Sequence, residues 1–261
     1  ALEPAMSRLV AVVAVLLALV AGPVAARAAV ATGIGWMPVG RFEIASTETT
    51  IGQFRRFVQA TGLRTLAERR GGGQAYEAGW THKPGWTWAA PFGQPGADDE
   101  PAVHLGFDEA QAYCRWAGGR LPSDAEWAAA AYLEQRTAPP APFVAGRRYA
   151  FPSGDSPQGA QCLNDCGAAA EQRALRHSAR LWRGHGHARA GSTPAGVNGL
   201  HEMAGNAWEW VDDPPGAAPG AERRTRGGSW WYGAAQMRED HHQGKPPDTT
   251  VVYIGFRCAR G

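Results

Sequence analysis

The sequence predicts one folded domain of the α+β class, with few helices, short strands and long loops. Its 261 residues include 34 glycines, 19 prolines and 11 tryptophans. This composition favours many turns held by large aromatic side chains over a helical bundle or an open parallel sheet. Helical periodicity is confined to a few short segments, and the strand-like segments are short and mostly late in the chain.

Three segments carry helix signals. Residues 50–61 place apolar side chains on one face, between a threonine that can act as N-cap and Gly62, which stops the helix. Residues 108–117 begin with acidic side chains, which suit the positive end of a helix, and finish before a pair of glycines. Residues 123–133 open with Ser123 and Glu126 at the spacing of a capping box.

The best strand candidates are residues 42–47, 224–231 and 251–258, the last of which is rich in β-branched and aromatic side chains. Residues 71–99 and 139–194 lack sustained periodicity and are rich in Gly, Pro, Arg and Trp. We therefore expect these two stretches to be long surface loops that carry the specificity of the protein.

The N-terminal segment has the pattern of a secretory signal. One dense apolar run covers residues 9–24, behind a basic start at residues 6–8 and before the small residues of an A-x-A site at 26–28. We expect residues 1–28 to be an upstream extension and signal peptide, and residues 29–261 to be a single exported domain. An uncleaved anchor is the alternative, but a spanning helix needs about 20 apolar residues, more than this run provides.

The charge balance is that of an ordinary folded protein. There are 26 basic and 24 acidic residues, 19% of the chain is charged, and 44% is hydrophobic. These values argue against a disordered or a nucleic-acid-binding protein. We expect no nucleic acid as partner and, after signal cleavage, no membrane.

The four cysteines are expected to be oxidised in an exported protein. They are Cys114, Cys162, Cys166 and Cys258, and an even count favours two disulfides out of three possible connectivities. Close spacing favours Cys162–Cys166, which leaves Cys114–Cys258. A metal or redox role for the Cys162–Cys166 pair is the alternative, although no second ligand pair with matched spacing stands nearby.

Four segments with recurring motifs follow one another along the chain. They are residues 48–57 (ETTIGQFRRF), residues 101–127 with the stretch DEAQAYCRWAGGRLPSDAEW, residues 198–210 (NGLHEMAGNAWEW), and residues 226–230 (RGGSW) with the closing GFRC at 255–258. Together they resemble the formylglycine-generating enzyme and sulfatase-modifying factor family. The resemblance implies that family's variant of the C-type lectin fold, and with it a disulfide between Cys114 and Cys258.

The GNAWEW stretch, residues 205–210, is a candidate calcium loop. It combines a turn, small residues, two indoles and a carboxylate, which can hold a hard cation through backbone carbonyls and one charged oxygen, although the residues alone favour a Trp-rich core turn. The resemblance implies structural calcium, with Glu202, Gly205, Ala207 and Glu209 at the ligand positions. A second calcium site is matched only by Asn164, because no acidic ligand is identifiable in residues 177–193.

The resemblance also identifies what the chain lacks. The reaction that names the family oxidises a substrate cysteine with dioxygen and needs two thiols that bind copper, since soft sulfur ligands select Cu(I). Those two positions fall at Tyr232 and Met237, and no other cysteine stands between Gly227 and Cys258. Copper and formylglycine generation by that route are therefore not expected.

Aromatic, methionine and histidine side chains crowd the segment that replaces the thiols. We take Trp231, Tyr232, Met237 and His241 as the candidate catalytic groove. Two adjacent imidazoles, His241 and the residue after it, offer a transition-metal site as an alternative, but neighbouring residues of a strand point to opposite faces. A second histidine pair, at 185 and 187, lies in an Arg-rich loop and is expected to be solvated.

The function implied is that of an exported, periplasmic or secreted maturation factor. Among family members without the cysteine pair, the sequence resembles most the exported proteins that mature the pyoverdine chromophore or accompany nitrite reductase. We expect oxidative maturation of a peptide or protein substrate. The alternative is a non-catalytic binding or accessory module on a lectin-like scaffold.

Overall fold

The computed structural model describes residues 32–175, 181–213 and 215–261. The expected signal segment lies outside these residues and stays a prediction. Residues 32–261 form one compact unit. No helix in the described part of the chain combines the length and the apolar character that a bilayer span requires.

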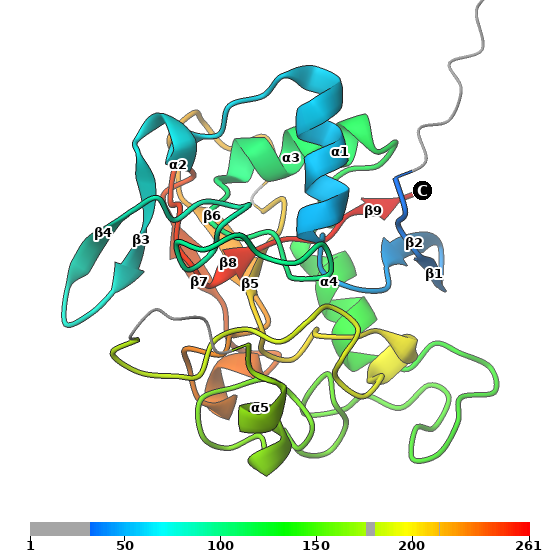
Figure 1. The fold of residues 1–261 in the computed structure, drawn as a ribbon. Coiled ribbons are helices and arrows are strands. Elements are labelled where there is room, and N and C mark those ends of the chain that lie inside the picture. The colour runs from blue at the N-terminus through cyan, green and yellow to red at the C-terminus, as the bar shows by residue number, and fades with distance from the viewer. Residues whose placement is uncertain (1–31, 176–180, 214) are drawn as a thin grey trace, which may run out of the picture. The chain divides into compact units, whose positions relative to one another are not determined.

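The strands are short and make three small sheets (Figure 1). The first sheet is antiparallel and has the order β1 (Trp36–Val39), β2 (Phe42–Ala45) and β9 (Ala259–Arg260). The second is the hairpin of β3 (Gly72–Tyr76) and β4 (Trp80–Pro84). The third has the order β7 (Gln243–Lys245), β6 (Arg223–Arg226), β5 (Trp208–Trp210) and β8 (Ile254–Gly255), with β5 and β8 parallel. Pairing of β2 with β9 joins the beginning and the end of the described chain.

The predicted helices form, and their ends follow the predicted capping signals. Helix α1 (Ile51–Thr61) begins at a capping box of Thr50 with Gln53 and ends at Gly62, whose φ is 69°. Helix α4 (Asp124–Tyr132) begins at the capping box of Ser123 with Glu126. The remaining helical elements are α3 (Phe107–Trp116), the short α2 (Leu66–Arg69) and α5 (Ala168–Arg173), and 3-10 turns at Val197–Gly199 and Ala234–Met237.

The two expected long loops contain structure that the sequence did not reveal. Residues 71–99 hold the β3–β4 hairpin, which packs so closely on His104 that a Cβ at Gly73 would lie 2.1 Å from the His104 Nδ1 atom. Residues 139–194 hold α5. All three expected strands are shorter than predicted. β2 ends at Ala45, and β6 ends where Gly227 and Gly228 have positive φ. Pairing in residues 251–258 is limited to β8 and an isolated bridge at Val251.

The main core is aromatic and lies between α1, α3 and the C-terminal segment. Phe54, Phe57, Tyr113 and Phe256 are buried, with neighbouring ring centroids 5.4–6.4 Å apart. The Cys114–Cys258 disulfide lies within this core and joins α3 to the segment that leads into β9, with a Cα–Cα distance of 5.4 Å. The predicted pairing is confirmed.

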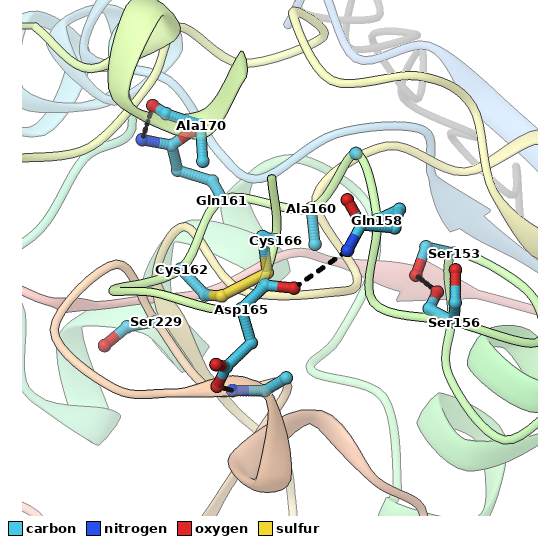
Figure 2. Close-up of a disulfide and its surroundings, with 12 residues drawn as sticks. Ser153, Ser156, Gln158, Ala160, Gln161, Cys162, Asp165, Cys166, Ala170 and Ser229 are labelled. Atoms are coloured by element: carbon cyan, nitrogen blue, oxygen red, sulfur yellow. Dashed lines mark hydrogen bonds between the residues drawn. A yellow bond between two sulfur atoms is a disulfide. The ribbon is translucent and has the colours of Figure 1, made fainter. Parts of the chain in front are cut away.

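The second disulfide, Cys162–Cys166, closes a small loop (Figure 2). The carbonyl of Asp165 accepts a hydrogen bond from Gln158 Nε2 at 3.2 Å, and its carboxylate accepts one from the backbone N–H of Ala234 at 3.2 Å. The loop is thereby attached to the 3-10 turn that follows Tyr232. All four cysteines are paired, so Cys162 and Cys166 form a disulfide and not a metal site.

Loss of the two disulfides is expected to have unequal effects. The chain-entropy model gives about 5 kcal/mol for the Cys114–Cys258 bridge, whose cysteines are 144 residues apart, and about 2 kcal/mol for Cys162–Cys166, which are 4 apart. Urea unfolding followed by tryptophan fluorescence should therefore show a larger loss in the Cys114→Ala/Cys258→Ala variant than in Cys162→Ala/Cys166→Ala. Equal losses with unchanged m-values would contradict this.

Candidate functional site

Glu209 lies in β5 and forms a fully buried ion pair with Arg257. The guanidinium donates from Nε and Nη2 to the two carboxylate oxygens at 2.8 and 2.7 Å. The indole Nε1 of Trp127, in α4, donates to Glu209 at 2.7 Å. Arg257 also donates to the backbone carbonyls of Ala45 and His201, at 3.0 and 2.8 Å. One ion pair thus contacts segments that are far apart in the sequence.

Two further buried carboxylates act on the same guanidinium. Glu48, between β2 and α1, accepts from Asn206 Nδ2 at 2.5 Å and from the backbone N–H of Ala207 at 2.8 Å. Glu202 accepts from the backbone N–H groups of Gly191 and Thr193 and from the Thr193 hydroxyl, at 2.8–3.0 Å. Burial opposes the charge of Arg257, but the carboxylates of Glu209, Glu48 and Glu202 raise its pKa. We call these three glutamates and Arg257 the carboxylate cluster.

The cluster has more negative than positive charge. Three ionised carboxylates and one guanidinium give a net charge of −2 in a region from which water is excluded, and uncompensated buried charge is costly. Burial, Glu209 and Glu202 together raise the pKa of Glu48 well above its ordinary value. A proton on Glu48 or a bound cation would each reduce this excess.

The expected calcium ligands lie in or beside the carboxylate cluster. Glu202 borders a cavity of about 40 Å³, which is also lined by Thr193, Gly196 and Ala204. Gly205 has a φ of +80°, and a Cβ there would lie 2.1 Å from the Gln161 carbonyl oxygen, so the turn requires glycine. The carboxylate of Glu209, however, already has Arg257 as its partner.

No group of three or more His, Cys, Asp or Glu side chains is placed to hold a metal within residues 32–175, 181–213 and 215–261. Asn164, the residue taken for a second calcium site, is exposed and lines a separate pocket with Glu171 and His185. The donor set at the carboxylate cluster would therefore have to include backbone carbonyl oxygens.

The structure divides the candidate catalytic groove in two. Trp231 and Met237 are fully buried and belong to the core. The prediction that they line a substrate groove is therefore wrong. Met237 packs in a small cluster with the Cys162–Cys166 disulfide. Tyr232 and His241 are partly exposed and remain accessible.

Tyr232 lies among aromatic rings and one arginine that the sequence analysis did not single out as a group. Its ring centroid is 5.7 Å from those of Trp208 and Tyr253, and the Arg183 Cζ atom lies 5.3 Å from it. Burial and the neighbouring Tyr232 phenol raise the pKa of Tyr253, which keeps its hydroxyl neutral. We call Trp208, Trp231, Tyr232, Tyr253 and Arg183 the aromatic cluster.

The histidines differ from expectation. His187 is fully buried and its Nε2 atom lies 2.8 Å from a Glu100 carboxylate oxygen, so the expectation that it is solvated is wrong. The His241 ring lies 5.8 Å from Trp208, and burial and His242 lower its pKa. His242 is largely exposed. The part of its ring that is removed from water and two neighbouring arginines lower its pKa.

Comparison with known proteins assigns the chain to a family. Residues 17–261 match the domain described as Sulfatase-modifying factor enzyme 1-like. The chain belongs to the sulfatase-modifying factor family. It is 32% identical to the formylglycine-generating enzyme of Streptomyces coelicolor over 200 residues, 66% of this chain and 57% of that enzyme. It is also 32% identical to the hercynine oxygenase of Mycolicibacterium thermoresistibile over 185 residues, 67% of this chain and 36% of that protein.

Solved structures support the fold assignment. PvdO from Pseudomonas aeruginosa matches with a TM-score of 0.55 and 21% identity, covering 84% of this chain and 80% of PvdO. CarF matches with a TM-score of 0.53 and 20% identity, covering 84% and 85%. The predicted α+β fold of the sulfatase-modifying factor family is confirmed. The chain spans little more than half the length of the Streptomyces enzyme.

The two residues that complete the carboxylate cluster stand in the family motifs. Glu48 opens the first motif and Arg257 lies in the closing GFRC, but their sequence positions do not reveal that they meet beside Glu209. Arg183 and Tyr253 stand outside the motifs, and only the fold brings them to Tyr232.

The raised pKa of Glu48 predicts a specific pH dependence of stability. Above its ordinary pKa of 4.5 the unfolded chain ionises Glu48 while the folded chain keeps the proton. Unfolding then releases a proton, so this group's contribution to stability falls as pH rises through the folded pKa. The free energy of unfolding of wild type minus that of Glu48→Gln should therefore decrease from pH 5 upward, measured by urea titration without added calcium.

Glu43→Gln is the matched control. A hydrogen bond from Arg260 lowers the pKa of Glu43, so its contribution is present above pH 4.5 and is lost as pH falls. The difference between wild type and this variant should change only on the acid side. A Glu48 difference that stays constant across the neutral range would show that the buried carboxyl does not take up a proton.

Proposed function

We propose that the chain is an exported sulfatase-modifying-factor-like protein that acts in the oxidative maturation of a peptide or protein substrate without a copper dithiolate. The observation that carries the proposal is the state of its cysteines: all four are held in two disulfides. The resemblance to the family places Tyr232 and Met237 at the positions of its thiol pair. A phenol and a buried thioether cannot replace two thiolates in holding Cu(I) and exchanging with a substrate thiol.

The accessible part of the aromatic cluster is the proposed substrate surface. Tyr232 is partly exposed, and Trp182 beside Arg183 is 58% exposed. Aromatic and arginine side chains are the types that dominate peptide recognition. Relatives named formylglycine-generating enzyme and hercynine oxygenase support an oxidative role, and two disulfides support an oxidising compartment.

A non-catalytic binding module is the second candidate. Burial of Trp231 and Met237 favours it, because it leaves only two of the four candidate catalytic residues, Tyr232 and His241, accessible to a substrate. Both candidate functions require that the protein binds a peptide. They differ in whether the mass of that peptide changes.

We also propose that the carboxylate cluster binds structural calcium. A divalent cation would neutralise the excess of negative charge beside Arg257, and calcium binds carboxylate and backbone carbonyl oxygens. Glu202 and the carbonyl oxygens of Gly205 and Ala207 would hold it, with Glu209 bound to Arg257 on the other side. The role of the ion would be charge compensation within the fold.

Calcium is expected to raise the melting temperature relative to EDTA, because an ion that binds only the folded state stabilises it by about 2.7 kcal/mol at 100 times its Kd. Glu202→Gln should abolish this difference, whereas Asp155→Asn, a change in an exposed ion pair with Arg147, should preserve it. Identical melting temperatures in calcium and EDTA would remove the calcium proposal and leave the proton on Glu48 as the source of charge compensation.

Formylglycine generation is expected to be absent. Purified protein supplied with copper and a reductant should leave a Cys-x-Pro-x-Arg peptide unchanged in mass, because no thiol pair is available.

Maturation is tested in a strain from which this protein has been deleted. Wild-type protein should restore an oxidised exported peptide or protein in that strain, and Tyr232→Ala should not. Tyr76→Ala, an exposed tyrosine on the β3–β4 hairpin, is the control.

Mass spectrometry decides between the candidates. Cysteine-to-aldehyde conversion that depends on the purified protein would contradict the proposed mechanism. A partner that binds wild type but not Tyr232→Ala, with no change in its mass, would favour the binding module.

A further inference from the structure

Arg183 is a partly buried cation surrounded by aromatic rings. Its Cζ atom lies 5.3 Å from the ring centroid of Tyr232, 5.4 Å from that of Trp231 and 5.9 Å from that of Trp182. Among the described residues, neither a carboxylate within ion-pair distance nor a hydrogen-bond acceptor is found for its guanidinium, and its Nε atom is buried. The guanidinium of Arg183 therefore contacts aromatic rings and no anion in the described part of the chain.

Several partly or fully buried arginines of the described chain pair with carboxylates, and Arg173 instead donates to the backbone carbonyls of Gly159 and Ala160. Arg136 pairs with Glu134 and Arg226 with Asp124. Even the exposed Arg189, six residues after Arg183, pairs with Asp99. A cation over an aromatic ring gains about 0.5–2 kcal/mol, less than the cost of removing a charge from water. Arg183 is therefore short of an anion.

We propose that the aromatic cluster recognises a carboxylate on the peptide substrate, next to an aromatic or apolar side chain that packs on Trp182 and Tyr232. This inference rests on the proposed function and names the substrate class of the same site. A guanidinium matches the planar carboxylate with two parallel hydrogen bonds. Among the residues described, Arg183 is the one cation over these rings. Its single positive charge matches a ligand with a single negative charge.

The test uses two small probes with the full chain. They are N-acetyl-L-phenylalanine, which has the carboxylate and the ring, and N-acetyl-L-phenylalaninamide, which has the ring alone. Binding is followed by the NMR shifts of the indole N–H groups. The carboxylate probe should bind wild type with a Kd of about 1 mM and the amide at least about 10-fold more weakly, because a hydrogen bond to a charged group contributes about 1.5–3 kcal/mol.

Arg183→Gln should reduce affinity for the carboxylate probe to that for the amide, and Arg189→Gln, an exposed arginine on the same segment, should leave both unchanged. Equal binding of the two probes, no binding of the carboxylate probe, or full affinity in folded Arg183→Gln would each overturn the inference. The readout is binding alone. A failure of the maturation assay with charge-dependent binding intact would therefore reject the proposed function and keep this site.

Discussion

The buried ion pair between Glu209 and Arg257 holds together segments that are far apart in the sequence. It joins β5 to the C-terminal segment and receives the indole N–H of Trp127 from α4, while Arg257 also bonds the carbonyls of Ala45 and His201. A structure with such short strands has few ladder hydrogen bonds to hold its sheets together. Breaking a buried ion pair by removing one partner costs about 3–5 kcal/mol, because it leaves an uncompensated charge.

The same ion pair determines the electrostatics of the loops around it. Arg257 compensates one carboxylate, whereas Glu48 and Glu202 hold nearby loops by accepting backbone and amide hydrogen bonds. Asn206 extends this network, since its side chain donates to Glu48 and accepts from the backbone N–H of Ala188 at 2.8 Å. The same carboxylates that hold these loops by accepting hydrogen bonds therefore create the excess of negative charge, which favours a proton or a cation.

The two residues that the sequence resemblance places at the family's thiol positions, Tyr232 and Met237, are not part of this framework. One disulfide, Cys114–Cys258, lies in the aromatic core and includes the residue directly after Arg257, and the other packs beside Met237. Met237 is buried in the core, whereas Tyr232 presents a phenol beside Arg183. A family scaffold can in this way keep its fold while the chemistry at one surface changes.

Features that depend on near neighbours or on covalent chemistry could be predicted from the linear pattern: the capped starts of α1 and α4, the disulfide pairs and the absence of a free thiol. Three others could be seen only in the folded chain: the burial of Trp231 and Met237, the pairing of Arg257 with Glu209, and the position of Arg183 over Tyr232. Capping acts over three or four residues, which a linear pattern records. Burial and ion pairing act between residues that meet only when the chain has folded, so a linear pattern does not record them.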